Sequence, residues 1–150
     1  MIKTFSEEVY FKTCNNFMTA IADGEFPASG SYIDVSDFER FAFIIRAGTL
    51  DSALTVAVQE AATIDGTAAT ISGATTTIAA SGNSGDNSLH IIEVETRKLT
   101  RNSGYNYVTL DITGAAGSND YADILFVGIN GHQFPVTQTA DTTVVVKVMG

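Results

Sequence analysis

The sequence predicts an all-β protein: an antiparallel β-sandwich of the jelly-roll kind, in a single domain with an N-terminal arm. One stretch alternates as a half-buried strand does, with a period of two residues. Its apolar side chains, Leu54, Val56 and Val58, would point to one face, and the residues between them would point to the other. Residues 41–47 are apolar on both faces, which places that strand nearer the centre of a sheet. No long helical crossover connects the predicted strands, which argues against parallel α/β folds.

The length and composition are those of one globular domain. At 150 residues the chain can bury a sizeable core, and it is 45% hydrophobic and 17% charged. We divide it into residues 1–30, an N-terminal arm or first strand, and residues 31–150, the β-sandwich domain. The single cysteine, Cys14, excludes an intrachain disulfide, and we expect it to be a small, buried or half-buried apolar residue.

The acidic balance of the chain argues against several kinds of partner. Eight Lys and Arg residues against 17 Asp and Glu residues give a formal net charge of -9 at pH 7. Nucleic-acid binding needs a basic footprint, and an anionic membrane surface would repel this charge. No window reaches the roughly 18 apolar residues of a membrane span, and acidic residues near the N-terminus replace the apolar stretch of a signal peptide. We expect no nucleic acid, no membrane, and synthesis in the cytoplasm.

Residues 1–30 mix aromatic and polar side chains without a firm period. Two alternatives stay open for them. They are an arm that docks on a neighbouring subunit, dispensable for folding, or an ordinary first strand that covers the domain's own core. The aromatic candidates for partner contacts in this segment are Phe5, Tyr10, Phe11 and Phe17.

Further strands are predicted where β-branched residues lie between turn signals. They are residues 31–36, 67–71, 75–79, 89–95, 105–113, 122–129 and 142–148. We expect one turn of helix or a tight bend over residues 36–39. A turn is predicted at Asn130 and Gly131, and the tail strand must pair in its own sheet or a neighbour's.

The sequence contains no catalytic constellation. His90 and His132 lie in different elements without a second metal-ligating side chain beside either. Asp86 and Asp120 sit in asparagine-containing turns that lack the glutamate and spacing of a calcium loop, so we expect both, like Asp123, to be solvated. Nothing titratable is clustered, so we expect no enzymatic activity, no metal and no cofactor.

A tyrosine pair is the remaining candidate for recognition. Tyr105 and Tyr107 share one face of a predicted strand. They would form either a contact patch for a partner or a side of the sandwich partly covered by a loop.

Four stretches carry a resemblance to a known family. They are residues 33–36 followed by 43–45, residues 56–61, residues 89–95 and residues 107–113. Over roughly residues 30–136, the chain resembles small virion proteins of tailed bacteriophages, and among them head decoration, or cement, proteins. Such proteins sit on the assembled capsid shell and reinforce contacts between major capsid subunits. The shared patterns are strand patterns, so the resemblance implies no catalytic residue.

The resemblance implies a location on the capsid surface, with the major capsid protein as partner. It also leads us to expect a homo-oligomer, with a trimer favoured, and the negative charge suits a soluble, highly copied component. Two other functions stay open. One is a tail, collar or fibre component of the virion, and the other is a carbohydrate-binding jelly roll with Tyr105 and Tyr107 as its stacking platform.

Overall fold

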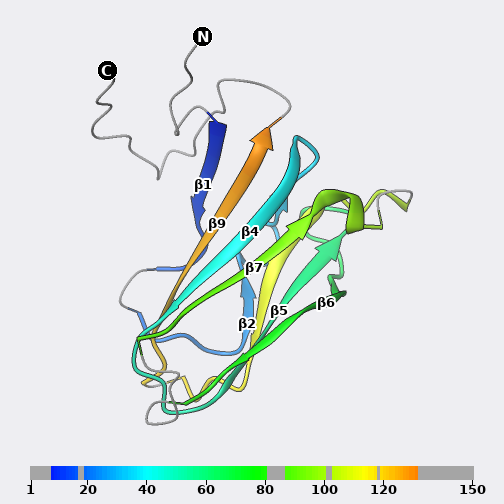
Figure 1. Ribbon diagram of the computed structural model, residues 1–150. Helices are drawn as coiled ribbons and strands as arrows, with labels where there is room; N and C mark the ends of the chain where they lie inside the picture. Colours follow the sequence, from blue (N-terminus) through cyan, green and yellow to red (C-terminus); the bar gives the residue numbers. More distant parts are fainter. Residues whose placement is uncertain (1–7, 17–18, 81–86, 101–102, 118, 132–150) are drawn as a thin grey trace, which may run out of the picture.

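The structure, a computed structural model, describes residues 8–16, 19–80, 87–100, 103–117 and 119–131 (Figure 1). In this part of the chain the regular structure is nearly all β, and two antiparallel sheets pack against each other, which confirms the predicted sandwich. A short 3-10 turn, η1 (Thr96–Lys98), follows one strand. The strands are β1 (Val9–Thr13), β2 (Gly24–Phe26), β3 (Ile33–Asp34), β4 (Phe38–Ala47), β5 (Leu54–Ala61), β6 (Ala69–Ile78), β7 (Leu89–Glu95), β8 (Tyr107–Thr113) and β9 (Ala122–Gly131).

The strand order is that of a jelly roll. One sheet runs β1-β9-β4-β7 and the other β2-β8-β5-β6, with β3 also paired to β8. The pairs β1·β9, β2·β8, β4·β7 and β5·β6 are nested about the connection between β5 and β6. The chain is therefore one long hairpin rolled into two layers.

The core lies between the two sheets. Leu54, Val56 and Val58 of β5 are fully buried, which confirms the alternation seen in the sequence. Leu110 and Ile112 of the neighbouring strand β8 are also fully buried and stand opposite Val58 and Val56. Since every second residue of both strands faces the core, their intervening residues form an outer surface.

An aromatic cluster joins β1, β4 and β9. The ring of Phe126 lies 5.7 Å from that of Phe41, and Phe38 packs on it at 6.3 Å. Tyr10 of β1 lies 5.4 Å from Phe38. Gly128 makes room for this packing, because a Cβ there would lie 2.7 Å from the ring of Phe38.

The N-terminal segment contributes strands to the domain itself. β1 pairs with β9 from Val9 opposite Ile129 to Thr13 opposite Leu125, and β2 pairs with β8. Of the two alternatives for this segment, residues 9–13 take the first-strand form. The predicted tail strand over residues 142–148 lies outside the described residues.

Three local predictions are refined by the structure. A bend rather than a helix precedes β4, since Asp34 Oδ1 accepts the Ser36 N–H at 2.9 Å. Residues 69–78 form one edge strand rather than two, because Gly73, at φ 82°, lets the strand continue through an irregularity in its pairing with β5. The turn predicted at residues 130–131 is wrong, since β9 continues through Gly131 to pair with Phe38.

Candidate functional site

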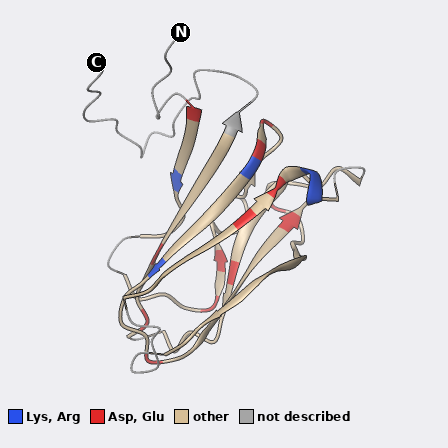
Figure 2. Ribbon diagram, viewed as in Figure 1, with Lys and Arg blue, Asp and Glu red and all other residues tan. Residues whose placement is uncertain are grey.

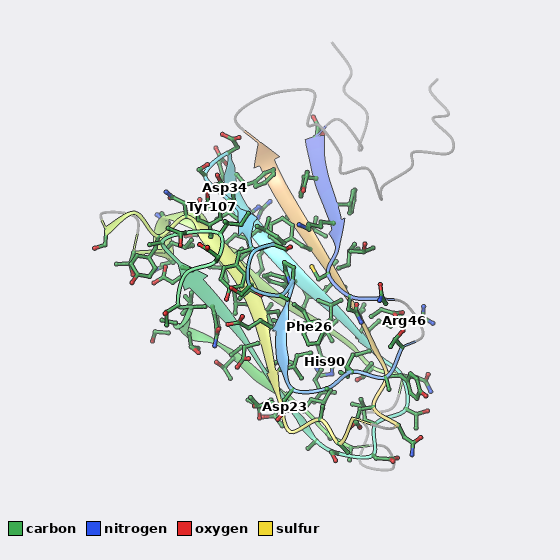
Figure 3. All side chains as sticks on the ribbon, turned by 180° about the vertical axis from the view of Figure 1, so that it is seen from behind. Asp23, Phe26, Asp34, Arg46, His90 and Tyr107 are labelled. Atoms are coloured by element: carbon green, nitrogen blue, oxygen red, sulfur yellow. The ribbon has the colours of Figure 1, made fainter. Side chains whose placement is uncertain are left out.

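The aromatic contact candidates do not gather on one patch. Tyr10 packs into the core from β1, and Phe11, the next residue along that strand, is half-buried. Tyr107 begins β8 in the other sheet, whereas Tyr105 precedes this strand, so the predicted strand face does not hold both; the two residues are half-buried. Tyr107 lies beside Asp34, its partner in the β3–β8 register, at the end of the molecule remote from Asp23 (Figure 3). Phe5 and Phe17 lie outside the described residues.

A hollow of about 660 Å³ lies along the connection between β1 and β2. It is lined by residues 13–16, by residues 19–26 and by Ala28. Asp23 and Glu25 are the carboxylates of this lining, so its charge is negative.

Three carboxylates come together beside this hollow. Glu25 stands opposite Asp111 in the β2–β8 register. Burial raises the pKa of Asp111, and the negative charges of Glu25 and Asp23 raise it further. Two of the three are already engaged: Asp23 accepts the Ala115 N–H at 2.7 Å, and Glu25 accepts the Tyr32 hydroxyl at 2.6 Å.

Tyr32 is a hydrogen-bond donor rather than a base in this cluster. Burial raises its pKa to about 12, helped by the hydrogen bond and the charge of Glu25. Among the residues that the structure describes, no group of three or more His, Cys, Asp or Glu side chains is arranged to hold a metal ion. The hydrogen bond from Tyr32 to Glu25 ties β2 to the loop that follows it.

Asp120 corrects an expectation from the sequence, since it is fully buried rather than solvated. Its Oδ1 accepts the N–H groups of Asp51 at 2.7 Å and Ser52 at 3.1 Å, and its Oδ2 accepts the N–H of Ala116. The loops before β5 and before β9 meet here, and their backbone N–H groups need an acceptor. The sequence carries no local signal of this meeting, because residues 51 and 120 are far apart along the chain.

A second buried carboxylate plays a similar part. Glu60 accepts the backbone N–H of Thr100 at 2.8 Å and its hydroxyl at 2.6 Å. This fastens the segment after η1 to the end of β5. Both buried acids thus stabilise loops.

Cys14 and His90 are held by local hydrogen bonds. The Cys14 thiol donates to the Lys12 carbonyl at 3.6 Å, and burial raises its pKa to about 12. The thiol is therefore protonated at neutral pH, as expected of an apolar cysteine. His90 Nε2 lies 2.9 Å from the Ser88 hydroxyl oxygen. His132 and Asp86 lie outside the described residues.

Asn15 has a structural role that the sequence did not reveal. Its side-chain nitrogen donates to the Ala122 carbonyl at 2.7 Å, and its side-chain oxygen accepts the Ile124 N–H at 2.9 Å. The side-chain amide thus takes the place of a backbone peptide and extends the pairing of β1 with β9 beyond the strand.

Comparisons of the chain with family profiles, curated proteins and solved structures find no match. Within the described residues, no helix is long and apolar enough to cross a membrane.

The buried acids Glu60 and Asp120 are occupied by backbone and hydroxyl donors. The side chains that face outward from the two sheets are therefore the ones to consider for recognition.

Proposed function

We propose that this chain is a structural virion protein of a tailed bacteriophage that decorates and stabilises the capsid shell by binding the major capsid protein. The observation that carries the proposal is the jelly-roll strand order, an architecture used by viral capsid domains as well as by lectins and cupins. Because a fold alone does not specify a function, the strand-pattern resemblance to decoration proteins and the chemistry of the side chains must support it as well.

The side chains favour binding over catalysis. A catalytic acid or base must be able to reach its substrate with a pKa matched to its task. Asp120 and Glu60 are instead enclosed by the hydrogen bonds of the loops they hold. The raised pKa of Tyr32 keeps this residue protonated at neutral pH. These side chains therefore support a protein that acts by binding a partner rather than by catalysis.

The shell contact is assigned to the end of the β3–β8 pair. Tyr107 stands there beside Asp34, with Tyr105 two residues earlier in the chain. Both rings are half-buried, so each keeps a free surface while its position is held by neighbours. Tyrosine is enriched in protein interfaces because it offers a large contact area with a polar end.

The proposal is tested by locating the chain in the particle that encodes it. Heads and tails are separated on a density gradient, and the chain is quantified in each fraction by mass spectrometry. We expect many copies on heads and lower head stability on dilution or heating when the chain is absent. Finding the chain in tails and not in heads would refute the proposal.

A binding assay tests the assigned contact. Purified protein is added to heads that lack it, and the bound fraction is measured by co-sedimentation. The Tyr107→Ala variant should lose most binding, whereas Thr77→Ala, on the same sheet but on β6, should bind like the unmodified protein. Equal binding by both variants would show that Tyr107 is not part of the contact.

A further inference from the structure

The two outer faces of the sandwich differ in chemistry. On the β2-β8-β5-β6 sheet, Thr113, Thr55 and Thr77 stand side by side in register, as expected of a face that meets water. In the middle of the β1-β9-β4-β7 sheet, most outward positions are apolar instead. We call the following six residues the apolar face: Ala42 and Ile44 on β4, Leu89 and Ile91 on β7, and Leu125 and Val127 on β9.

The apolar face is exposed where its side chains are largest. Leu89 and Ile91 are 62% and 59% exposed, Ile44 and Leu125 are half-buried, and Ala42 and Val127 are already buried. The register places Leu125, Ile44 and Ile91 in one row across three strands, so these side chains form a continuous surface. An apolar surface of this kind on one side of a sheet marks an interaction site.

Most charges on this face stand at its two ends, and each end carries both signs; Glu93 lies one row inward, opposite Ala42. Arg46 lies opposite Asp123 at one end, and Arg40 lies opposite Glu95 at the other. Glu93 forms an ion pair with Arg40 at 3.2 Å. Figure 2 shows the middle stretches of β4 and β9 free of charged residues. The row of Arg46 and Asp123 is complementary to a copy of itself in which β4 and β9 are exchanged.

We propose that a second copy of this chain covers the apolar face, related by a two-fold axis that runs parallel to the strands between β9 and β4. Such an axis keeps each row in register and exchanges β9 with β4, as in an isologous contact. It brings Leu125 over Ile44 of the second copy and Arg46 over Asp123 of the second copy. The sheets would pack face to face about 10 Å apart, as sheets do within sandwiches.

The area of the four-stranded face is that of a small interface. Strands spaced by about 4.8 Å with a rise of about 3.3 Å per residue give the four-stranded face, whose strands β1, β9, β4 and β7 have five, ten, ten and seven residues, a flat area of roughly 500 Å². The accessible surface buried exceeds the flat area, because side chains make the surface rough. It therefore approaches the roughly 800 Å² per partner of a stable interface.

The test is the mass of the full-length protein in solution, measured by light scattering or sedimentation at tens of micromolar. We expect twice the chain mass. Ile91→Lys, at an exposed position, and Leu125→Lys should each reduce it to the chain mass, whereas Thr77→Lys, on the opposite outer face, should leave it unchanged. Circular dichroism establishes that each variant is folded. Because Ile91 is exposed, its variant tests the interface even if Leu125→Lys does not fold.

A charge exchange tests the two-fold register itself. Arg46→Asp places only carboxylates at this end of both copies, and Asp123→Arg places only guanidinium groups there, so each single variant should be a monomer. The double variant restores opposite charges and should restore the dimer. A native protein that is a monomer or a trimer would overturn the inference, as would a double variant no more dimeric than the singles. Particle localisation does not enter this test, so the virion role and the two-fold contact fail independently.

Discussion

At the scale of single residues, the buried acids are the most informative side chains. Asp120 is fully buried and receives backbone N–H groups from two loops. A buried charge is tolerated only when hydrogen bonds replace its water, and here the backbone donors do so. The loops before β5 and β9 therefore depend on one carboxylate for their mutual position.

Asp120→Ala should destabilise the fold by about 3 kcal/mol, because it leaves several buried N–H groups without an acceptor. The measurement is the free energy of unfolding from urea titration followed by circular dichroism. Asp37→Asn, in an exposed turn, is the matched control and should change the stability by less than about 0.5 kcal/mol. Similar losses in both variants would show that Asp120 does not hold the loops.

Asp111 carries a pH-dependent prediction. Its folded pKa is raised by burial, by Glu25 and by Asp23, so the folded state holds this proton more tightly than the unfolded chain does. Ionisation of Asp111 thus costs stability above its folded pKa, and that cost disappears as pH falls below the unfolded pKa near about 3.9.

Asp111→Asn should therefore stabilise the protein at pH 7 by a few tenths of a kcal/mol to about 1 kcal/mol. The gain over the unmodified protein should vanish by about pH 3. Thermal unfolding of the two proteins across this pH range measures the difference. A gain that persists at pH 3 would assign the effect to packing or hydrogen bonding rather than to charge.

At the scale of elements, β1 and β2 decide how the N-terminal segment should be understood. Each adds an edge strand to a different sheet, and Tyr10 and Cys14 belong to or pack against the core. A segment with these contacts is a structural part of the domain. The expectation that an arm over residues 1–30 is dispensable for folding conflicts with this pairing.

Deletion of residues 1–30 should leave the protein unable to fold cooperatively, since it exposes the edges of β9 and β8 and part of the aromatic cluster. The readout is the loss of a cooperative thermal transition. Deletion of residues 1–7 alone retains both strands and serves as the control. A stable domain after the longer deletion would contradict the assignment of these strands to the core.

At the scale of the whole molecule, the rolled hairpin makes one cooperative core. β5 lies between β8 and β6 in its sheet, and its inward side chains face the opposite layer. A charge placed on these positions is therefore buried between both sheets at once. Because nested pairs have large sequence separations, we expect loss of this core to unfold both layers together.

Val56→Asp or Val58→Asp should unfold the domain, because each buries an unpaired carboxylate. Near-ultraviolet circular dichroism and the thermal transition report the loss. Thr55→Asp, on the exposed side of the same strand, should retain the fold. A folded Val56→Asp protein with its usual transition would show that β5 is peripheral to the core.

The sequence by itself determined most of the strands after residue 30, including the alternation of β5 and β8 and the central position of β4. It did so because the two-residue period of a strand is a local property that neighbouring residues reveal. Only the tertiary structure decided that β1 pairs with β9, that Asp120 is enclosed by two loops, and that the outward side chains of β4 and β9 leave an apolar face. These outcomes depend on which distant segments become neighbours, and strand patterns with similar apolar periods do not specify that choice.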